Sequence, residues 1–128
     1  MKLLLDTHTF IWWSSEPDRL SPRVLSLCED IENSLILSVA SIWEMQIKLQ
    51  LGKLKLHIPL QNLVESQQKA NNIQILSIDQ EHVFELHNLP THHNDPFDRL
   101  LIVQANVEGA HLVSKDEILA RYQVKLLW

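Results

Sequence analysis

The chain has 128 residues, of which 45% are hydrophobic and 21% charged, and its formal net charge is -5 at pH 7. This composition is that of an ordinary globular protein, so we expect one domain over residues 1–128 with a buried core. The acidic balance argues against a nucleic-acid binder that works through bulk positive charge. It still allows an enzyme that meets phosphates through bound divalent cations. Because only 2 glycines are present, a glycine-rich phosphate loop and a dinucleotide fingerprint are excluded.

The first predicted elements alternate between a strand and a helix. The run Leu3–Leu5 is a candidate buried strand. The pair Ser21–Pro22 then begins a helix whose apolar residues recur at helical spacing as far as Ile31, and Asn33 ends it.

The middle of the chain continues the same alternation. A second strand over Ser34–Val39 is followed by a helix over Ala40–Leu51. Gly52 then stands in the usual place of a C-terminal cap. Another helix covers about Leu60–Ala70 and is broken at Asn71–Asn72.

The last third repeats the pattern and completes the predicted sheet. Its elements are a strand over Ile73–Ile78, a helix over Gln80–His87, a polar loop over His92–Pro96, a helix that carries Asp98 and ends at Gly109, a strand over His111–Ser114, and a short fifth strand within Val124–Trp128. Such alternation predicts an α/β domain with a mainly parallel sheet of four to five strands.

Four acidic residues lie where an apolar run meets a loop or a helix: Asp6, Glu44, Asp98 and Asp116. Ligand sites in open parallel sheets form at the carboxyl ends of the strands, which is where the first and last of the four lie. Unpaired carboxylates at the edge of a core are costly, and their mutual repulsion is offset by a cation. If the fold brings the four together, they form a metal site made of oxygen ligands.

Each of these acids also has a purely structural interpretation. The alternatives are helix caps for Asp6 and Asp116, a capping box with Asp95 for Asp98, and an ion pair with Lys48 for Glu44. Asp79 also follows a predicted strand and precedes a helix. Local context alone therefore does not separate an acid of the site from an acid that caps a helix.

Other kinds of site find little support. The adjacent His92 and His93 suggest zinc, but no HxxxH, HExxH or CxxC spacing is present. Cys28 has no disulfide partner in the chain, which predicts a core position and a reducing cytoplasm. The N-terminal apolar run is too short for a signal peptide, and no apolar stretch reaches the roughly 18 residues that cross a membrane.

Four segments follow one another in a recognisable order and spacing. They are LLDTH at residues 4–8, SVASIWE at 38–44, HNDPFDRLLIVQA at 93–105 and LVSKD at 112–116. With these segments the chain resembles the PIN-domain ribonucleases of the VapC type, the toxins of toxin–antitoxin pairs, over essentially its full length. Ser114-Lys115 departs mildly from the Thr-Arg more usual before the last acid.

The resemblance implies a three-layer α/β/α fold with a central parallel sheet and an acidic pocket that binds Mg²⁺ or Mn²⁺. By position, it makes Asp6, Glu44, Asp98 and Asp116 both catalytic and metal-binding residues. It leaves Asp79 out of the pocket and keeps Asp95 as a cap or outer-shell residue. The hydroxyls of Thr7 and Ser41 are placed near the pocket, where they can support the acids or bound waters.

The implied reaction is in-line hydrolysis of an RNA phosphodiester that leaves a 5′-phosphate. Arg99, Lys115 and Arg121 are candidates for phosphate contacts, with solvated surface charge as the alternative. The resemblance further implies a homodimer and a small antitoxin that lays an apolar segment into a groove. The candidate groove residues are Phe10, Trp12 and Trp13; adjacent residues of a helix point about 100° apart, so at least one of the two tryptophans is expected to face outward.

Three other functions fit an acidic α/β domain less well. A phosphoacceptor receiver domain needs adjacent acids after the first strand, whereas Asp6 stands alone there. A haloacid-dehalogenase-like phosphatase needs Asp-x-Asp, but position 8 is His8. A catalytically silent binding module is disfavoured because all four acids are present.

Overall fold

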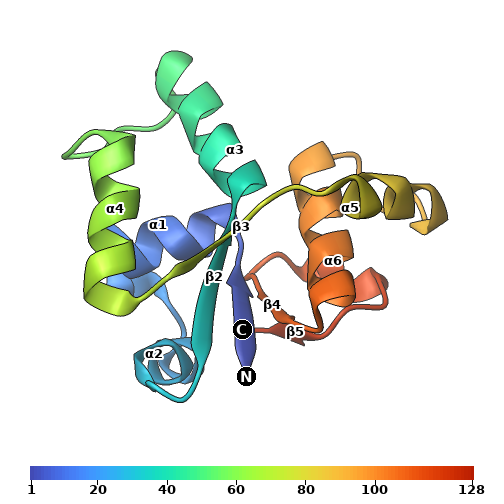
Figure 1. The fold of residues 1–128 in the computed structure, drawn as a ribbon, viewed down its shortest axis with the longest axis horizontal. Helices are drawn as coiled ribbons and strands as arrows, with labels where there is room; N and C mark the ends of the chain where they lie inside the picture. Colours follow the sequence, from blue (N-terminus) through green and yellow to red (C-terminus); the bar gives the residue numbers. More distant parts are fainter.

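The computed structural model describes residues 1–128 and contains one sheet of five strands in the order β3-β2-β1-β4-β5 (Figure 1). Every neighbouring pair is parallel. The strands are β1 Lys2–Leu5, β2 Ser34–Ser38, β3 Gln74–Leu76, β4 His111–Val113 and β5 Leu126–Leu127. In the central register Leu4 of β1 lies beside Ile36 of β2 and Leu112 of β4.

Helices cover both faces of this sheet. They are α1 Thr7–Ser15, α2 Pro22–Glu29, α3 Val39–Gln50, α4 Leu60–Asn71, α5 Gln80–Glu85 and α6 Pro96–Glu108, with 3-10 turns η1 Pro17–Arg19, η2 Leu86–Asn88 and η3 Glu117–Arg121. Figure 1 shows α1 to α4 on one side of the sheet and α5 and α6 on the other. The predicted three-layer α/β/α fold with a parallel sheet is therefore confirmed.

The period of two along β1 divides the apolar core between the layers. Leu3 and Leu5 pack in a cluster with buried residues of α1 to α4, including Phe10. Leu4 packs in a second cluster with α6 residues such as Leu101 and Ile102. All three leucines of the strand are fully buried, as expected for a central strand of a parallel sheet that is covered on both faces.

Several predicted boundaries shift because side chains redirect the backbone. The second helix ends at Glu29 rather than near Asn33, so Ile31 lies in a turn and is 95% exposed. In that turn the Asp30 carboxylate accepts the Glu32 N–H at 2.9 Å, and the Asn33 amide donates to Leu27 O at 2.9 Å. The Asn33 bond satisfies a carbonyl of the helix end without a further turn of helix, so the predicted extension of the helix to Ile31 is wrong.

The start of α3 shows the same effect. The Ser38 hydroxyl accepts the Ala40 N–H at 3.0 Å, so the helix begins at Val39 and the second strand is one residue shorter than predicted. The third strand is also shorter, at three residues. The helix ends at Gly52 and Gly109 are as predicted, with φ of 70° and 66°, the left-handed conformation that glycine adopts without strain.

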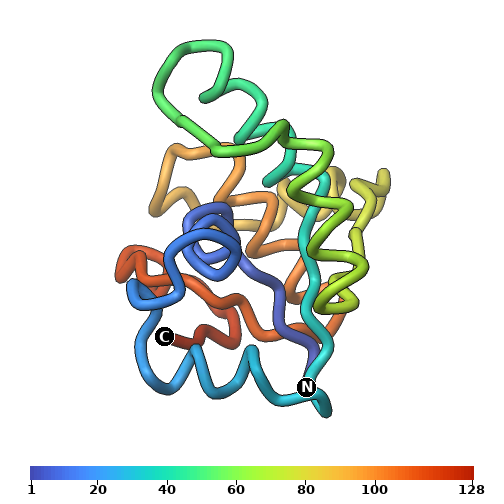
Figure 2. Tube along the Cα trace, turned by 90° about the vertical axis from the view of Figure 1, so that its left-hand side faces the viewer, coloured from blue at the N-terminus to red at the C-terminus, as the bar shows by residue number.

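The topology brings several chain segments to one edge of the sheet. Because the strands are parallel, the carboxyl ends of β1, β2 and β4 meet at the same edge, from which α1 and α3 also start. Figure 2 shows both chain termini at one end of the molecule, with the connection between α3 and α4 projecting at the opposite end. None of the helices is both long enough and apolar enough to cross a membrane.

Candidate metal centre

Asp6 stands directly after β1 and is buried at the shared edge of the sheet. Its backbone N–H donates to Val113 O of β4 at 3.1 Å, which fixes the residue between the two strands. Its Oδ1 accepts the Thr9 N–H at 2.8 Å, so the predicted cap of α1 is present. The cap uses Oδ1 and leaves Oδ2 without a hydrogen bond, so the carboxylate can cap the helix and bind a metal ion at the same time.

Glu44 lies one turn into α3 and is also buried. Its Oε1 accepts a hydrogen bond from the Thr7 hydroxyl at 2.7 Å, and its Oε2 lies 2.8 Å from Lys48 Nζ. The predicted ion pair is therefore present, and the carboxylate is held beside the residue that follows Asp6. Ser41, one turn earlier, has a buried hydroxyl with no hydrogen-bond partner, which is available to a water of the site.

Asp98 and Asp116 come together around a histidine. His93 Nε2 lies 2.9 Å from Asp98 Oδ2 and 3.7 Å from Asp116 Oδ2. Asp116 uses Oδ1 to accept the Ile118 N–H at 3.0 Å, so it too divides its oxygens between a cap and the cluster. Asp95 accepts the N–H groups of Phe97 and Asp98 and caps α6 as predicted. The Asp98 carboxylate bonds His93 instead of returning to Asp95, so the reciprocal capping box does not form.

Asp6, Glu44 and Asp98 interact electrostatically at this edge. The pKa of Asp98 is raised to about 6, first because the carboxyl is buried and next because Asp95 is close. The hydrogen bond from His93 lowers this pKa, while the negative charges of Asp6 and Glu44 raise it further. A carboxylate that is buried among other carboxylates is destabilised, and a bound cation relieves this repulsion. The donor set of carboxylate oxygens fits Mg²⁺ or Mn²⁺.

The acids of this edge are not all equally close to one another. His93, Asp98 and Asp116 each present a ligand atom within 4.8 Å of the others, whereas Asp6 and Glu44 lie outside that group. Asp6 and Glu44 nevertheless lie close enough to raise the pKa of Asp98. Thr7, which follows Asp6, donates a hydrogen bond to Glu44.

Asp79 lies in a different cluster. It is followed by His82, whose Nδ1 accepts the Asp79 N–H at 3.0 Å and whose Nε2 lies 3.4 Å from Glu108 Oε1. Both ring nitrogens are therefore engaged in holding α5 against α6. Asp79, whose local sequence context resembles that of Asp116, is therefore the N-cap of α5.

A buried glutamine positions α6 relative to the site. Gln104 accepts the Ser38 hydroxyl at 2.5 Å and donates to Ser77 O at 3.2 Å. These bonds tie the middle of α6 to the carboxyl ends of β2 and β3. The helix that carries Asp98 is thus held over the same edge as Asp6.

The three basic residues predicted to contact phosphate lie in different surroundings. Arg99 donates to Pro90 O at 2.7 Å and to Leu89 O at 3.4 Å, so part of its guanidinium fastens the preceding loop. Arg121 lines a separate cavity beside the second half of α6. Lys115, next to Asp116, lies 6.0 Å from the centroid of the Trp12 ring and remains at the rim of the site.

Sequence reasoning missed His93. In the sequence, the adjacent His92 and His93 suggest only zinc ligands, for which no partner spacing exists. The available signal was the position of His93 five residues before Asp98, across the Asp95–Pro96 turn that begins α6. Such a turn folds the preceding residue back onto the first turn of the helix.

The same four-segment pattern is found in a known family. The PIN domain family matches residues 3–125.

The chain belongs to the PIN domain family.

One curated relative of this PIN domain is Ribonuclease VapC22 of Mycobacterium tuberculosis, which is 32% identical over 94% of this chain and 92% of its own. Among solved structures, VapBC2 from Rickettsia felis bound to a promoter DNA fragment has a TM-score of 0.74 at 19% identity, covering 99% of this chain and 98% of that chain. A toxin–antitoxin complex from Klebsiella pneumoniae has a TM-score of 0.61 at 14% identity, covering 98% and 96%. At these identities the solved structures show the likeness of fold.

Proposed function

We propose that this PIN domain is a divalent-metal-dependent endoribonuclease and the toxin of a type II toxin–antitoxin pair. The observation that carries the proposal is the proximity of two buried acids, Asp6 and Glu44, to Asp98 at the carboxyl edge of the sheet, where they raise its pKa. The relative that is 32% identical over nearly its full length is a ribonuclease, which supports this class of reaction. The family also removes the receiver-domain alternative.

Asp6, Glu44, Asp98 and Asp116 are the proposed catalytic and metal-binding residues, with Mg²⁺ or Mn²⁺ as the ion. Such an ion, when bound, lowers the pKa of a coordinated water and stabilises the oxygens of an in-line displacement at phosphorus. The chain supplies the geometry. Thr7 orients Glu44, and His93 orients Asp98 through contacts of 2.7 and 2.9 Å. Asp6 and Asp116 each cap a helix through Oδ1, which accepts a backbone N–H, so the Oδ2 atom of each remains available to the metal ion.

Incubation with total RNA tests the proposal. Wild-type protein with Mg²⁺ or Mn²⁺ is expected to cut RNA internally and to leave 5′-phosphate ends, and EDTA is expected to stop the reaction because the acids then lack their cation. Gel analysis and labelling of the new ends are the measurements. Absence of cleavage with either metal, or cleavage that EDTA leaves intact, would contradict the assignment.

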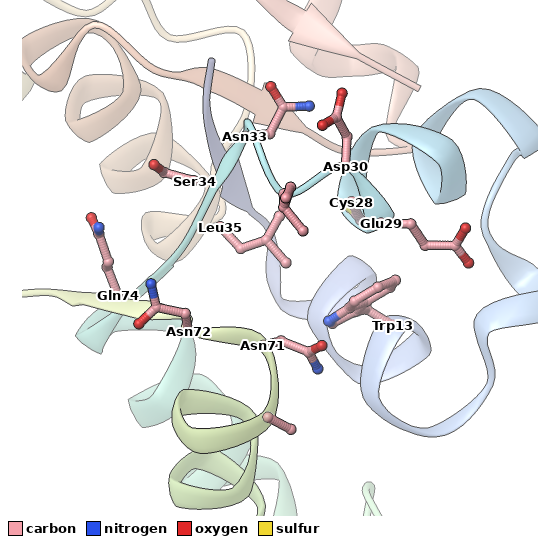
Figure 3. A pocket seen from close by; sticks show the side chains of 12 residues that line it. Trp13, Cys28, Glu29, Asp30, Asn33, Ser34, Leu35, Asn71, Asn72 and Gln74 are labelled. Carbon is pink, nitrogen blue, oxygen red and sulfur yellow. The ribbon is translucent and has the colours of Figure 1, made fainter.

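A protein antitoxin is the proposed partner, since one of the similar solved structures is a toxin–antitoxin complex. A cavity of about 420 Å³ lies between α1, α2 and α4, remote from the four acids (Figure 3). Trp13 faces it from α1, and its buried indole N–H has no hydrogen-bond partner. A partner backbone carbonyl would satisfy this donor once the side chains that cover it move on binding. Phe10 is fully buried, so its predicted place in the groove is wrong.

Co-purification tests this partner. We expect that a short upstream reading frame encodes a DNA-binding protein that co-purifies with this chain and quenches or shifts Trp13 fluorescence. Trp13→Phe removes the unpartnered donor but keeps the aromatic packing, so it is expected to weaken the complex about five- to tenfold, the effect of one hydrogen bond. If Trp13→Phe binds the partner as tightly as the wild type does, the partner does not contact Trp13.

A homodimer, a cytoplasmic location and a single domain over residues 1–128 complete the proposal. Val83 and Phe84 on α5 are exposed and offer an apolar surface to a second copy. Cys28 is buried, and burial raises the pKa of its thiol to about 11, with a smaller contribution from Glu29. An unreactive, unpaired thiol agrees with a reducing compartment.

A further inference from the structure

A groove borders the acidic cluster on the side of α3. It has a volume of about 480 Å³ and runs between the end of α3 and the loop that enters α6. Its lining includes Glu44, Lys48, Leu51, Lys53, Asn94 and Phe97. Because Glu44 belongs to the acidic cluster, the groove is continuous with the proposed catalytic site, and we call it the α3 groove.

Two lysines and two acids line the α3 groove. Lys48 Nζ lies 2.8 Å from Glu44 Oε2, at the boundary between the acids and the groove. The Lys53 N–H donates to Lys48 O at 2.8 Å after the chain turns at Gly52, which holds Lys53 close to the helix end, with its side chain exposed. The second acid of the lining, Asp95, has Oδ1 engaged by two backbone N–H groups. Lys48 is paired with Glu44, whereas Lys53 is exposed and has no ion-pair partner, so Lys53 favours an anionic occupant.

An exposed aromatic side chain stands beside this groove. Trp43 directly precedes Glu44 on α3 and is 59% exposed. Its ring packs edge-to-face on Phe97 of the groove, with centroids 5.3 Å apart at 77°. Phe97 thus holds the indole in place and leaves much of its surface to solvent. A base of a single-stranded nucleic acid stacks on such a surface.

We propose that the single-stranded RNA segment next to the cleaved bond lies in the α3 groove, with Lys48 and Lys53 contacting phosphates and a base stacking on Trp43. This rests on the proposed function. An apolar peptide is disfavoured as the occupant because it would cover Lys53 without supplying an anion to pair with it. Phosphates provide the opposite charge, and the nearby indole provides the stacking surface that a flexible strand requires.

RNA binding measured without cleavage tests the proposal. Fluorescence anisotropy of a labelled single-stranded RNA is followed over a salt series with Mg²⁺, in an Asp98→Asn background in which cleavage is expected to be about a hundredfold slower. For each lysine that contacts a phosphate, replacement by Ala is expected to reduce the slope of log K against log salt concentration by about 0.7. Lys53→Ala is the decisive single variant because it leaves the contact of Lys48 with Glu44 intact. Lys55→Ala is the matched control, since Lys55 is exposed two residues further on but does not line the groove.

The stacking contact is tested separately. Trp43→Leu is expected to weaken RNA binding at least about fivefold, whereas Trp43→Phe retains most of the affinity because it keeps an aromatic face. Unchanged salt slopes and unchanged affinity in the lysine and tryptophan variants, while the wild type still cuts RNA, would overturn the groove and leave the ribonuclease assignment standing. Loss of antitoxin binding with intact RNA binding would assign the groove to the protein partner. If the wild type neither binds nor cuts RNA, both proposals fall.

Discussion

Replacement of Asp98 by Asn is expected to reduce metal-dependent RNA cleavage by about a hundredfold or more, since a bound metal contributes several kcal/mol to transition-state stabilisation. Asp98 is the acid that the other charges of the cluster influence most clearly, with a pKa raised to about 6. Asparagine keeps the size of the side chain and its ability to bond His93, but it removes the negative charge. The measurement is the initial cleavage rate at saturating Mg²⁺ or Mn²⁺.

A thermal melt separates loss of chemistry from loss of folding. Because Asp98→Asn removes a charge that is repelled by its neighbours, the metal-free variant is expected to melt at or above the wild-type temperature. Added metal is expected to raise the melting temperature of the wild type and to have little effect on the variant, since only a folded state that binds the ion is stabilised by it. A variant that melts well below the wild type would make the activity measurement uninformative, and Asp6→Asn would then replace it.

Asp79→Asn is the matched control for this prediction. Asp79 also follows a strand and caps a helix, yet it lies with His82 and Glu108 outside the acidic pocket. Asparagine is a good helix N-cap, so folding is expected to persist with full cleavage activity. If Asp79→Asn lost activity as Asp98→Asn does, the assignment of the four acids would be wrong.

Replacement of Phe10 by Ala is expected to destabilise the fold by about 3–5 kcal/mol. Phe10 is fully buried where α1 packs against the sheet, in a cluster with Leu3, Leu5 and Met45. Its removal leaves a cavity that these side chains cannot fill without moving. Urea denaturation at fixed protein concentration measures the change, and the melting temperature is expected to fall by roughly 10 °C or more.

Ile31→Ala is the control for Phe10→Ala. Both residues are large and apolar, but Ile31 is 95% exposed in the turn after α2. Its truncation is expected to change the free energy of unfolding by less than about 0.5 kcal/mol. A loss of several kcal/mol at Ile31 would mean that α2 extends in solution as the helical spacing predicted. A small loss at Phe10 would contradict the packing of α1.

Much of the fold could be predicted from local chemistry. Ser21–Pro22 begins α2 with the Ser21 hydroxyl accepting the Val24 N–H at 3.1 Å, and Gly109 ends α6, because caps depend on residues within a few positions. Ile31 was misplaced because its apolar character extended a helical pattern that the Asp30 and Asn33 side chains terminate. Such competition between a local hydrogen bond and a periodic pattern is decided by geometry rather than by spacing.

The alternation of strands and helices, the family resemblance and the helix caps at Asp6, Asp95 and Asp116 could be predicted from the sequence, because each depends on neighbouring residues or on an ordered series of motifs. The tertiary structure brought His93 between Asp98 and Asp116, turned Arg99 toward backbone carbonyls and buried Phe10. These outcomes depend on which strand ends meet at one edge of the sheet. Contacts between residues far apart in the chain are set by strand order and helix packing, which local patterns do not encode.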